Sequence, residues 1–519
     1  MTESRTRKSL RNGAYSASLF IVNIILSFVA RGVFVRHVGV DLLGLNTSVE
    51  NLLGLLSLAE LGVSYAIVSS LYAPMSCGDY AKVAEVVALQ GWIYRRVALF
   101  IIAGSAVLMA FFPVIFADAD FPLWYAYAAY VAYLFSALLG YFVNYKMVVI
   151  DVCQESYKVT LATRVPNAVR TVLQIFALAF TSYGYEIWLA LNIICAIVSS
   201  AILSHIVRRD HPYLSRPVAG GRILLSKYPE VGTKVRQLMV QRISAIAFQR
   251  SSPVILLAFS SLAEVGVYGN YMLIFSGVSM LVESVFNGMN ASVGNLVNSS
   301  PRRHILDVFH EILTMRIVVG AVCAFGFYFC TPAFVDLWVG RELRLDSLAA
   351  LLLSLTLFVD ISRAAVDSFI NSKGYFSDIY APVAEAVLNI GLSVALGSVW
   401  GLHGILAGVL ISLFVVIVWW KPYFLFRVKM HVGYGEFLRA YWWAVAVAAV
   451  LAVCFFFFRC AFPECGSPFA NLAFNICLSV LFFSILSAIL AFSTLGGRRL
   501  VERFRRLISN RAKPLSNQL

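Results

Sequence analysis

Long apolar stretches alternate with short polar segments along almost the whole chain. A helix needs about 20 mostly apolar residues to cross a bilayer, and a single polar break is enough to separate two such helices. The pattern predicts an all-α, polytopic membrane protein with fourteen transmembrane helices. The expected spans are 14–35, 42–72, 91–116, 121–144, 157–181, 184–207, 236–259, 265–297, 308–335, 347–370, 376–398, 402–420, 437–458 and 469–494.

The composition agrees with this pattern. Of the 519 residues, 60% are hydrophobic and 13% are charged, whereas an ordinary soluble domain is roughly 45–50% apolar and about 25% charged. A chain this apolar is neither a soluble enzyme, nor a nucleic-acid-binding module, nor a disordered protein. The first apolar run is too long for a cleavable signal, and more spans follow it.

The net charge of +14 is explained by topology. With the N-terminus in the cytoplasm, 33 of the 41 Lys and Arg residues fall on cytoplasmic segments and three fall inside spans. This asymmetry follows the positive-inside rule and predicts that both termini are cytoplasmic. No nucleic-acid partner is needed. The five outer residues are Arg31, Arg36, Arg341, Arg344 and Arg459.

An approximate internal repeat divides the chain. Four pairs of similar positions are separated by 216–223 residues, and two of them are Pro166 with Pro382 and Gly184 with Gly401. Two six-helix lobes of the same orientation, with a cavity between them, are typical of an alternating-access transporter. The predicted parts are an N-lobe (1–207), a basic cytoplasmic linker (208–235), a C-lobe (236–430), two additional spans (431–495) and a basic cytoplasmic tail (496–519).

No motif for covalent chemistry or cofactor binding is found. The sequence has no P-loop, no G-x-S-x-G, no H-E-x-x-H and no His or Cys spacing typical of a metal site, so we expect neither an enzyme nor a cofactor. The short predicted outer loops also disfavour a glycan polymerase or ligase. Cys460 and Cys465 share the last outer loop, where either a disulfide or two free thiols are consistent with the sequence.

Three arginines lie inside predicted spans. At about 1.5 Å per residue, Arg170 lies ~18 Å and Arg250 ~21 Å from the nearest polar flank, close to the midplane. Arg316 lies only ~8 Å deep, so its side chain is expected to extend to the cytoplasmic interface. A charge within the bilayer costs at least ~2.5–3.5 kcal/mol, which makes each of the three a functional candidate. The structural alternative for Arg170 is a pair with an acid such as Glu385.

Acidic residues in the spans are candidates for ion coupling. Glu60, Glu283 and Asp360 are the main candidates for a proton or Na⁺ site. Structural ion pairs are the competing interpretation, because Asp360 and Arg363 are spaced i, i+3 on one helix face.

Several segments resemble one known family. The segments DLLGLN (41–46), SLAELG (57–62), EVGVYGNY (264–271), ASVGNL (291–296) and APVAEAVLNIGLSVAL (381–396) are similar to those of bacterial polysaccharide and oligosaccharide flippases of the multidrug/oligosaccharidyl-lipid/polysaccharide exporter superfamily. The resemblance extends over about residues 15–430. Relatives often carry a Thr-Asp-Asn run in the seventh span, where this chain has Gln249-Arg250-Ser251.

The resemblance implies a substrate and a location. The substrate would be a polyprenyl-pyrophosphate-linked oligosaccharide, flipped across the bacterial cytoplasmic membrane for surface polysaccharide such as lipopolysaccharide. Arg31 joins the candidates here, since relatives often carry an arginine late in the first span. Arg31, Arg170, Arg250 and Arg316 would then line a cationic cavity for the pyrophosphate. Expected partners are the lipid-linked oligosaccharide, membrane lipids and glycan polymerase or assembly proteins.

Three alternatives remain open. A cation-coupled drug exporter of the same superfamily usually has an acid in the first span, whereas the only charge within 14–35 is that of Arg31. A membrane-embedded glycan polymerase or ligase would need a larger outer domain. A non-transporting scaffold for glycan-assembly enzymes would have no use for buried arginines.

Overall fold

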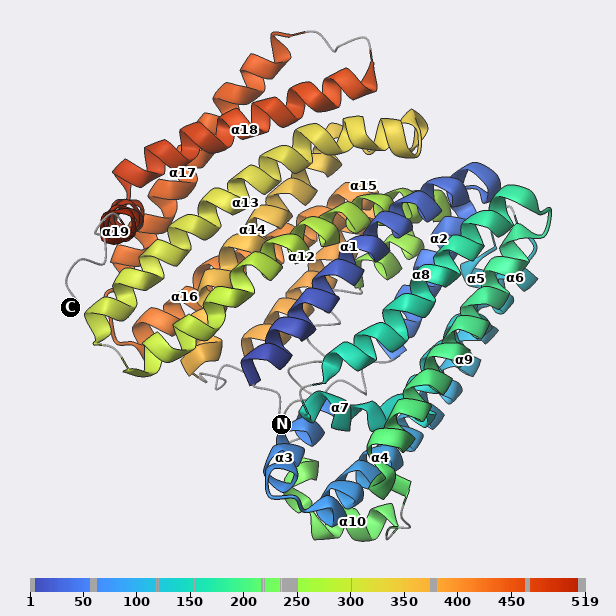
Figure 1. Ribbon diagram of the computed structural model, residues 1–519. Helices are drawn as coiled ribbons and strands as arrows, with labels where there is room; N and C mark the ends of the chain where they lie inside the picture. Colours follow the sequence, from blue (N-terminus) through green and yellow to red (C-terminus); the bar gives the residue numbers. More distant parts are fainter. Residues whose placement is uncertain are drawn as a thin grey trace. The chain divides into compact units, whose positions relative to one another are not determined.

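A computed structural model describes most of the chain. The described residues are 5–56, 63–117, 119, 121–153, 155–215, 218, 220–233, 235, 251–299, 301–373, 380–462 and 467–511. All regular structure among them is helical (Figure 1). The chain forms two compact units, unit 1 (Met1–Gly269) and unit 2 (Asn270–Leu519). The all-α prediction is confirmed, while the exact boundaries of the predicted lobes stay a prediction.

Unit 1 is a bundle in which α1 packs along α8, α8 along α9, α6 along α9 and α3 along α4. α12 begins in this unit and continues into unit 2. Its elements are α1 (Arg5–Val38), α2 (Val40–Leu56), α3 (Val63–Ser76), α4 (Tyr80–Ala110), α5 (Phe112–Ile115), α6 (Trp124–Phe142), η2 (Asn144–Met147), α7 (Val148–Val152), α8 (Ser156–Phe180), α9 (Gly184–Asp210), η3 (Pro212–Ser215), α10 (Gly221–Lys227) and α12 (Leu262–Ser299).

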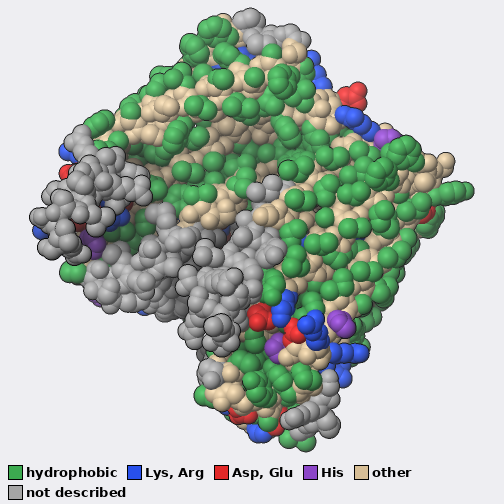
Figure 2. All heavy atoms as spheres, in the orientation of Figure 1, with side chains coloured by type: hydrophobic (Ala, Val, Ile, Leu, Met, Phe, Trp, Pro, Cys, Tyr) green, Lys and Arg blue, Asp and Glu red, His purple; other side chains and the backbone are tan. Residues whose placement is uncertain are grey.

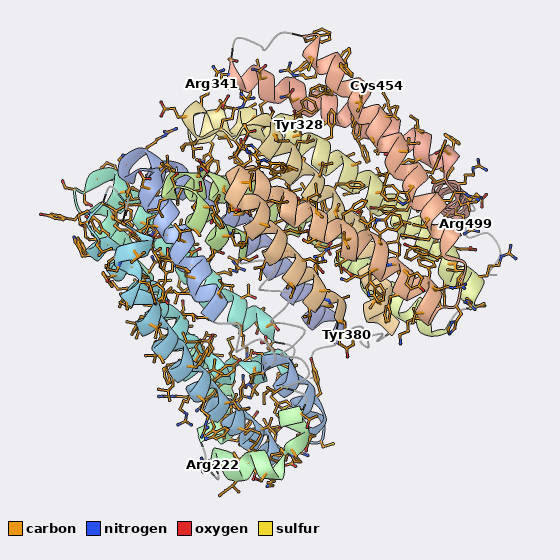
Figure 3. All side chains as sticks on the ribbon, turned by 180° about the vertical axis from the view of Figure 1, so that it is seen from behind. Arg222, Tyr328, Arg341, Tyr380, Cys454 and Arg499 are labelled. Carbon is orange, nitrogen blue, oxygen red and sulfur yellow. The ribbon has the colours of Figure 1, made fainter. Side chains whose placement is uncertain are left out.

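In unit 2, α13 is the central helix and contacts α14, α17, α18 and α19. Arg341, just beyond α13, and Arg499 on α19 lie at opposite ends of this unit (Figure 3). The elements are α13 (Arg302–Trp338), η4 (Arg341–Leu343), α14 (Ser347–Lys373), α15 (Tyr380–Leu413), η5 (Phe414–Trp420), α16 (Lys421–Tyr423), η6 (Phe424–Lys429), α17 (Tyr434–Cys460), α18 (Pro468–Ser493) and α19 (Leu495–Arg511).

Local sequence explains where these helices start and stop. Gly39 has a φ of +100°, which ends α1 one residue before α2 begins. The Asp79 carboxylate accepts a hydrogen bond from the Lys82 amide at 3.0 Å and caps α4. Ser467 caps α18 in the same way, with Pro468 in the first turn, where its missing N–H costs nothing.

Each unit contains a tightly packed helical hairpin. In unit 1, α8 and α9 run antiparallel, and Gln174 Nε2 donates to the Trp188 carbonyl at 3.0 Å. In unit 2, α15 reverses direction at Gly401, whose φ is +55°. Asn389 and Ser412 face each other across this hairpin. The reversal separates the spans expected at 376–398 and 402–420.

The molecular surface is largely apolar. Large side chains that point away from the protein include Val114 at 76% exposure, Phe180 at 79% and Val399 at 72%. Figure 2 shows hydrophobic side chains spread over most of the visible face. Surface of this kind is stable only against lipid. Within the described residues, nine helical segments are long and apolar enough to cross a bilayer, one of them the α15 hairpin with its π-helical extension. The chain is a multi-pass membrane protein.

Gly404 is required for the α15 hairpin, and this can be tested. A Cβ at Gly404 would overlap the Leu396 carbonyl oxygen, whereas a Cβ at Gly391 on the same helix would meet nothing within 4 Å. We expect Gly404→Ala to destabilise the protein by about 1–3 kcal/mol, because the obstacle is backbone. Thermal unfolding of the purified protein checks this. Gly391→Ala is the matched control and should leave the melting temperature unchanged or slightly higher.

Candidate functional site

Unit 1 places two of the predicted arginines in one region. Arg31 is on α1 and is half-buried. Its guanidinium lies close to Gly269 near the start of α12, because a Cβ added at Gly269 would be only 2.5 Å from Arg31 Nη2. The same Cβ would be 3.2 Å from Thr47 Oγ1 on α2. Arg170 is on α8, which packs along α1. Its Nε atom is buried and has no hydrogen-bond partner among the described residues. An arginine in this state has a donor available for an anion.

An acid and a phenol connect these two arginines. The Glu50 carboxylate on α2 lies within electrostatic range of the Arg31 guanidinium. Tyr133 on α6 lies within range of both Glu50 and Arg170. We call Arg31, Glu50, Tyr133 and Arg170 the unit 1 arginine cluster. It combines two cations with one carboxylate, so it carries net positive charge.

Packing beside the cluster fixes the helices that carry it. Tyr185 on α9 is buried and donates from its hydroxyl to Asn46 Oδ1 on α2 at 3.0 Å. The Phe34 ring on α1 packs edge-on against both Tyr185 and Trp188, with ring centroids 5.9 and 5.0 Å away. These contacts join α1, α2 and α9, and α1 in turn lies against α8. The cluster is therefore attached to a rigid part of the bundle, as a binding site requires.

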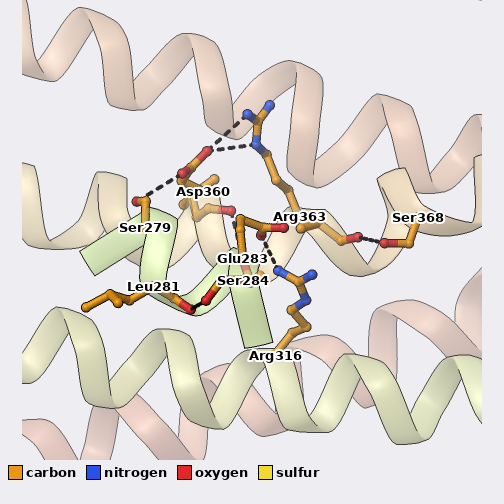
Figure 4. Close-up of polar contacts among 11 residues, drawn as sticks. Ser279, Leu281, Glu283, Ser284, Arg316, Asp360, Arg363 and Ser368 are labelled. Atoms are coloured by element: carbon orange, nitrogen blue, oxygen red, sulfur yellow. Dashed lines mark hydrogen bonds and ion pairs between the residues drawn. The ribbon is translucent and has the colours of Figure 1, made fainter. Parts of the chain in front are cut away.

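Unit 2 brings Arg316 and Glu283 together. Arg316 Nη1 on α13 donates to Glu283 Oε1 on α12 at 2.5 Å, and the guanidinium also lies 4.0 Å from the centroid of the Phe286 ring (Figure 4). The Arg316 side chain is only 1% exposed, whereas that of Glu283 is 43% exposed. The expectation that Arg316 extends to the interface is wrong, because an acid and an aromatic face on the neighbouring helix hold it inside the protein.

Asp360 forms a second ion pair close to the first one. Asp360 Oδ1 accepts from Arg363 Nε at 3.0 Å within α14, which confirms the neutralising pair predicted from their spacing. Its other carboxylate oxygen accepts from Ser279 Oγ on α12 at 3.4 Å. Figure 4 shows both ion pairs, with Glu283 and Asp360 on neighbouring helices.

A third pair extends this network. Lys421 Nζ on α16 donates to Asp367 Oδ1 on α14 at 2.9 Å. Asp367 also lies within electrostatic range of Arg363 and Arg316. The buried Glu385 on α15 lies within range of Arg363 and Lys421.

We call these seven side chains the unit 2 charge network. Three are basic and four are acidic, so within this described set the acids exceed the bases by one. The members are Glu283, Arg316, Asp360, Arg363, Asp367, Glu385 and Lys421.

The structure describes the positions of five of the seven predicted site residues. It places Arg31 and Arg170 in the unit 1 arginine cluster, and Arg316, Glu283 and Asp360 in the unit 2 charge network. The other two, Arg250 and Glu60, lie outside the described residues, as does Cys465.

The sequence alone does not identify Tyr133 and Lys421 as members of these sites. Tyr133 sits in the run 124–135, where ten of the twelve residues are aromatic or alanine and nothing marks one tyrosine. Lys421 follows Trp419 and Trp420 and belongs to the basic residues that the charge asymmetry assigns to the cytoplasmic side. An acid on another span is its partner, and sequence separation gives no sign of that contact.

Comparison with known proteins gives the fold. No protein-family model matches the sequence, and no curated protein matches it. Among solved structures, the chain is similar to a lipid II flippase, MurJ, in an inward closed conformation, with 13% identity and a TM-score of 0.67 over 94% of this chain and 99% of that one.

Two multidrug resistance transporter structures are also similar. An inward-facing MATE family transporter of the MOP superfamily matches with 11% identity and a TM-score of 0.55, over 78% of this chain and 97% of the other. The outward-facing conformation of a MATE family transporter of that superfamily gives 15% identity and a TM-score of 0.50, over 79% and 93%. The chain therefore has the fold that the MurJ flippase and MATE transporter structures share.

Proposed function

We propose that this chain is a transporter, and not an enzyme, that flips a polyprenyl-pyrophosphate-linked oligosaccharide from the cytoplasmic to the outer leaflet of a bacterial cytoplasmic membrane. It works by alternating access, has both termini in the cytoplasm and belongs to the MOP superfamily. The flipped substrate would supply surface polysaccharide assembly, where glycan polymerase or assembly proteins are its partners.

The observation that carries this proposal is how much of the chain the flippase fold accounts for. The MurJ structure matches 94% of this chain. The inward-facing MATE structure matches only 78% of this chain, even though 97% of that transporter is included in the match. A drug exporter with the MATE fold leaves about a fifth of this chain without a counterpart. A flippase fold leaves very little, which favours a lipid-linked substrate.

The unit 1 arginine cluster supports an anionic substrate. A pyrophosphate cannot cross about 30 Å of hydrocarbon without compensating charge. Arginine suits phosphate oxygens because its planar guanidinium offers paired donors. Arg170 has a buried donor without a partner among the described residues, and this is what a site awaiting an anion requires.

The unit 2 charge network supports coupling to a cation. Its acids outnumber its bases by one, and a buried excess negative charge is costly unless a proton or a monovalent cation neutralises it. Glu283 and Asp360 are the members we propose for this role. Glu283 is the more accessible, with 43% of its side chain exposed.

The test is a flipping assay in proteoliposomes. A fluorescent polyprenyl-pyrophosphate oligosaccharide is placed in both leaflets, and a membrane-impermeant reagent measures its exchange between them. We expect protein-dependent exchange for this lipid and no transport of organic cations such as ethidium. Ethidium transport without lipid exchange would instead support the drug exporter. Absence of both activities, with several glycans, would contradict the proposal.

A further inference from the structure

A polar cavity in unit 1 shares no lining residue with the arginine cluster. It has a volume of about 290 Å³ and is formed by the end of α6, η2, the end of α9 and η3. A second cavity of about 530 Å³ adjoins it, because the two share Tyr145, Lys146, Arg208 and Leu214. Lys146 and Arg208 belong to segments that the charge asymmetry predicts to be cytoplasmic.

The charges of this cavity are unbalanced. Lys146 and Arg208 both line it, and neither has an ion-pair partner among the described residues. No acid is found among the described lining residues. The nearby acids Glu155 and Asp210 both lie 2.6 Å from Lys158 Nζ, and Arg209 Nε lies 3.8 Å from Asp210, so two cations already balance these two acids. Two cations without an acidic partner in the lining favour the binding of an anion in this cavity.

Two buried polar atoms in the same lining also have no hydrogen-bond partner among the residues that the structure describes. His211 is only 9% exposed, and its Nε2 atom has no hydrogen-bond partner within the described chain. Its Nδ1 atom lies 3.2 Å from the Tyr213 hydroxyl. When that hydroxyl donates to Nδ1, the ring proton resides on Nε2, which then offers an N–H to a ligand. Asn144 Oδ1 is the other such atom, and it is an acceptor.

The cavity also has an apolar edge. Phe142 and Val143 line it and are 43% and 36% exposed, at the end of a predicted transmembrane helix. Figure 2 shows basic and acidic side chains gathered on this part of unit 1, over α7, with hydrophobic surface adjoining them. The cavity thus presents hydrogen-bond donors for a phosphate, an acceptor for a hydroxyl and an apolar surface for the acyl chain of a lipid.

We propose that this cavity binds a phosphodiester or phosphomonoester whose other substituent carries a hydroxyl, as in glycerol phosphates. Lys146, Arg208 and His211 Nε2 donate to the phosphate oxygens, and Asn144 Oδ1 accepts from the hydroxyl. The ligand is either the headgroup of an anionic lipid, whose chains lie against Phe142 and Val143, or a soluble glycerol phosphate.

Native mass spectrometry of the purified full chain tests the site with three probes: dioleoylphosphatidylglycerol, dioleoylglycerol and glycerol 3-phosphate. We expect phosphatidylglycerol to bind at least tenfold more tightly than dioleoylglycerol. In the double variant Lys146→Gln/Arg208→Gln this affinity should fall by tenfold or more, since each cation supplies a charge-assisted hydrogen bond. Glycerol 3-phosphate binding with the same dependence would identify a soluble ligand; its failure to bind would identify the lipid.

The matched control removes two charges from the same side of unit 1. Lys82→Gln/Arg222→Gln changes two exposed residues outside the lining of either cavity. It should leave the affinity within about twofold of wild type. The conservative variant His211→Gln keeps an N–H donor and should lose less affinity than His211→Ala. Equal losses in both double variants, or no phosphate-dependent binding of either probe, would overturn the proposal.

Discussion

Flipping of the lipid-linked oligosaccharide should fall at least tenfold when either Arg31 or Arg170 is replaced by alanine. Each guanidinium is expected to make a charge-assisted hydrogen bond to the pyrophosphate, worth about 1.5–3 kcal/mol, and ~1.4 kcal/mol corresponds to a factor of ten. If both contact the same phosphate group, the double variant should lose less than the product of the two single losses. The proteoliposome flipping assay measures these rates.

The chain offers a control on each of the two helices. Arg36 on α1 is exposed and lies five residues beyond Arg31; Arg164 on α8 is exposed and lies six residues before Arg170. Arg36→Ala and Arg164→Ala remove the same charge from the same helices and should flip at wild-type rate. Arg170→Lys should retain part of the activity, because lysine keeps the charge but not the paired donors. If all four alanine variants behave alike, the arginine cluster is not the substrate site.

The all-α fold and most spans could be predicted because the bilayer imposes a simple constraint. Apolar runs of about 20 residues must be helical, and breaks such as Gly39 and Gly401 separate them in the sequence as they do in the structure. The depth of a charge could also be counted. The partner of a charge at that depth could not be predicted, because it depends on which helices are neighbours.

Arg316 illustrates that limit. Its depth suggested extension to the interface, yet its partner Glu283 is 33 residues earlier, on the preceding helix, and buries it. Asp367 and Lys421 are 54 residues apart, and their contact has no local signature. The pair Asp360 and Arg363 was predictable because both residues lie on one helix at i, i+3. Ion pairs within a helix follow from spacing, whereas pairs between helices require the packing.

The strongest effect on stability is expected at the Arg316–Glu283 pair, and it should be unequal between the two partners. In Glu283→Gln the Arg316 guanidinium, only 1% exposed, loses the carboxylate that contacts it directly. Breaking such a buried pair costs about 3–5 kcal/mol, and ~2–4 °C of melting temperature accompanies each kcal/mol in a unit of this size. In Arg316→Met the remaining carboxylate is 43% exposed and can be hydrated or protonated, so the loss should be smaller.

The double variant Glu283→Gln/Arg316→Met decides whether the pair itself causes these losses. In this variant neither residue of the pair is charged, and the methionine can still pack against the Phe286 ring. Its melting temperature should therefore lie above that of Glu283→Gln. Lys227→Gln, which breaks an ion pair on a residue that is 54% exposed, is the control and should leave the melting temperature nearly unchanged. A double variant no more stable than Glu283→Gln would show that Glu283 stabilises unit 2 through contacts other than Arg316.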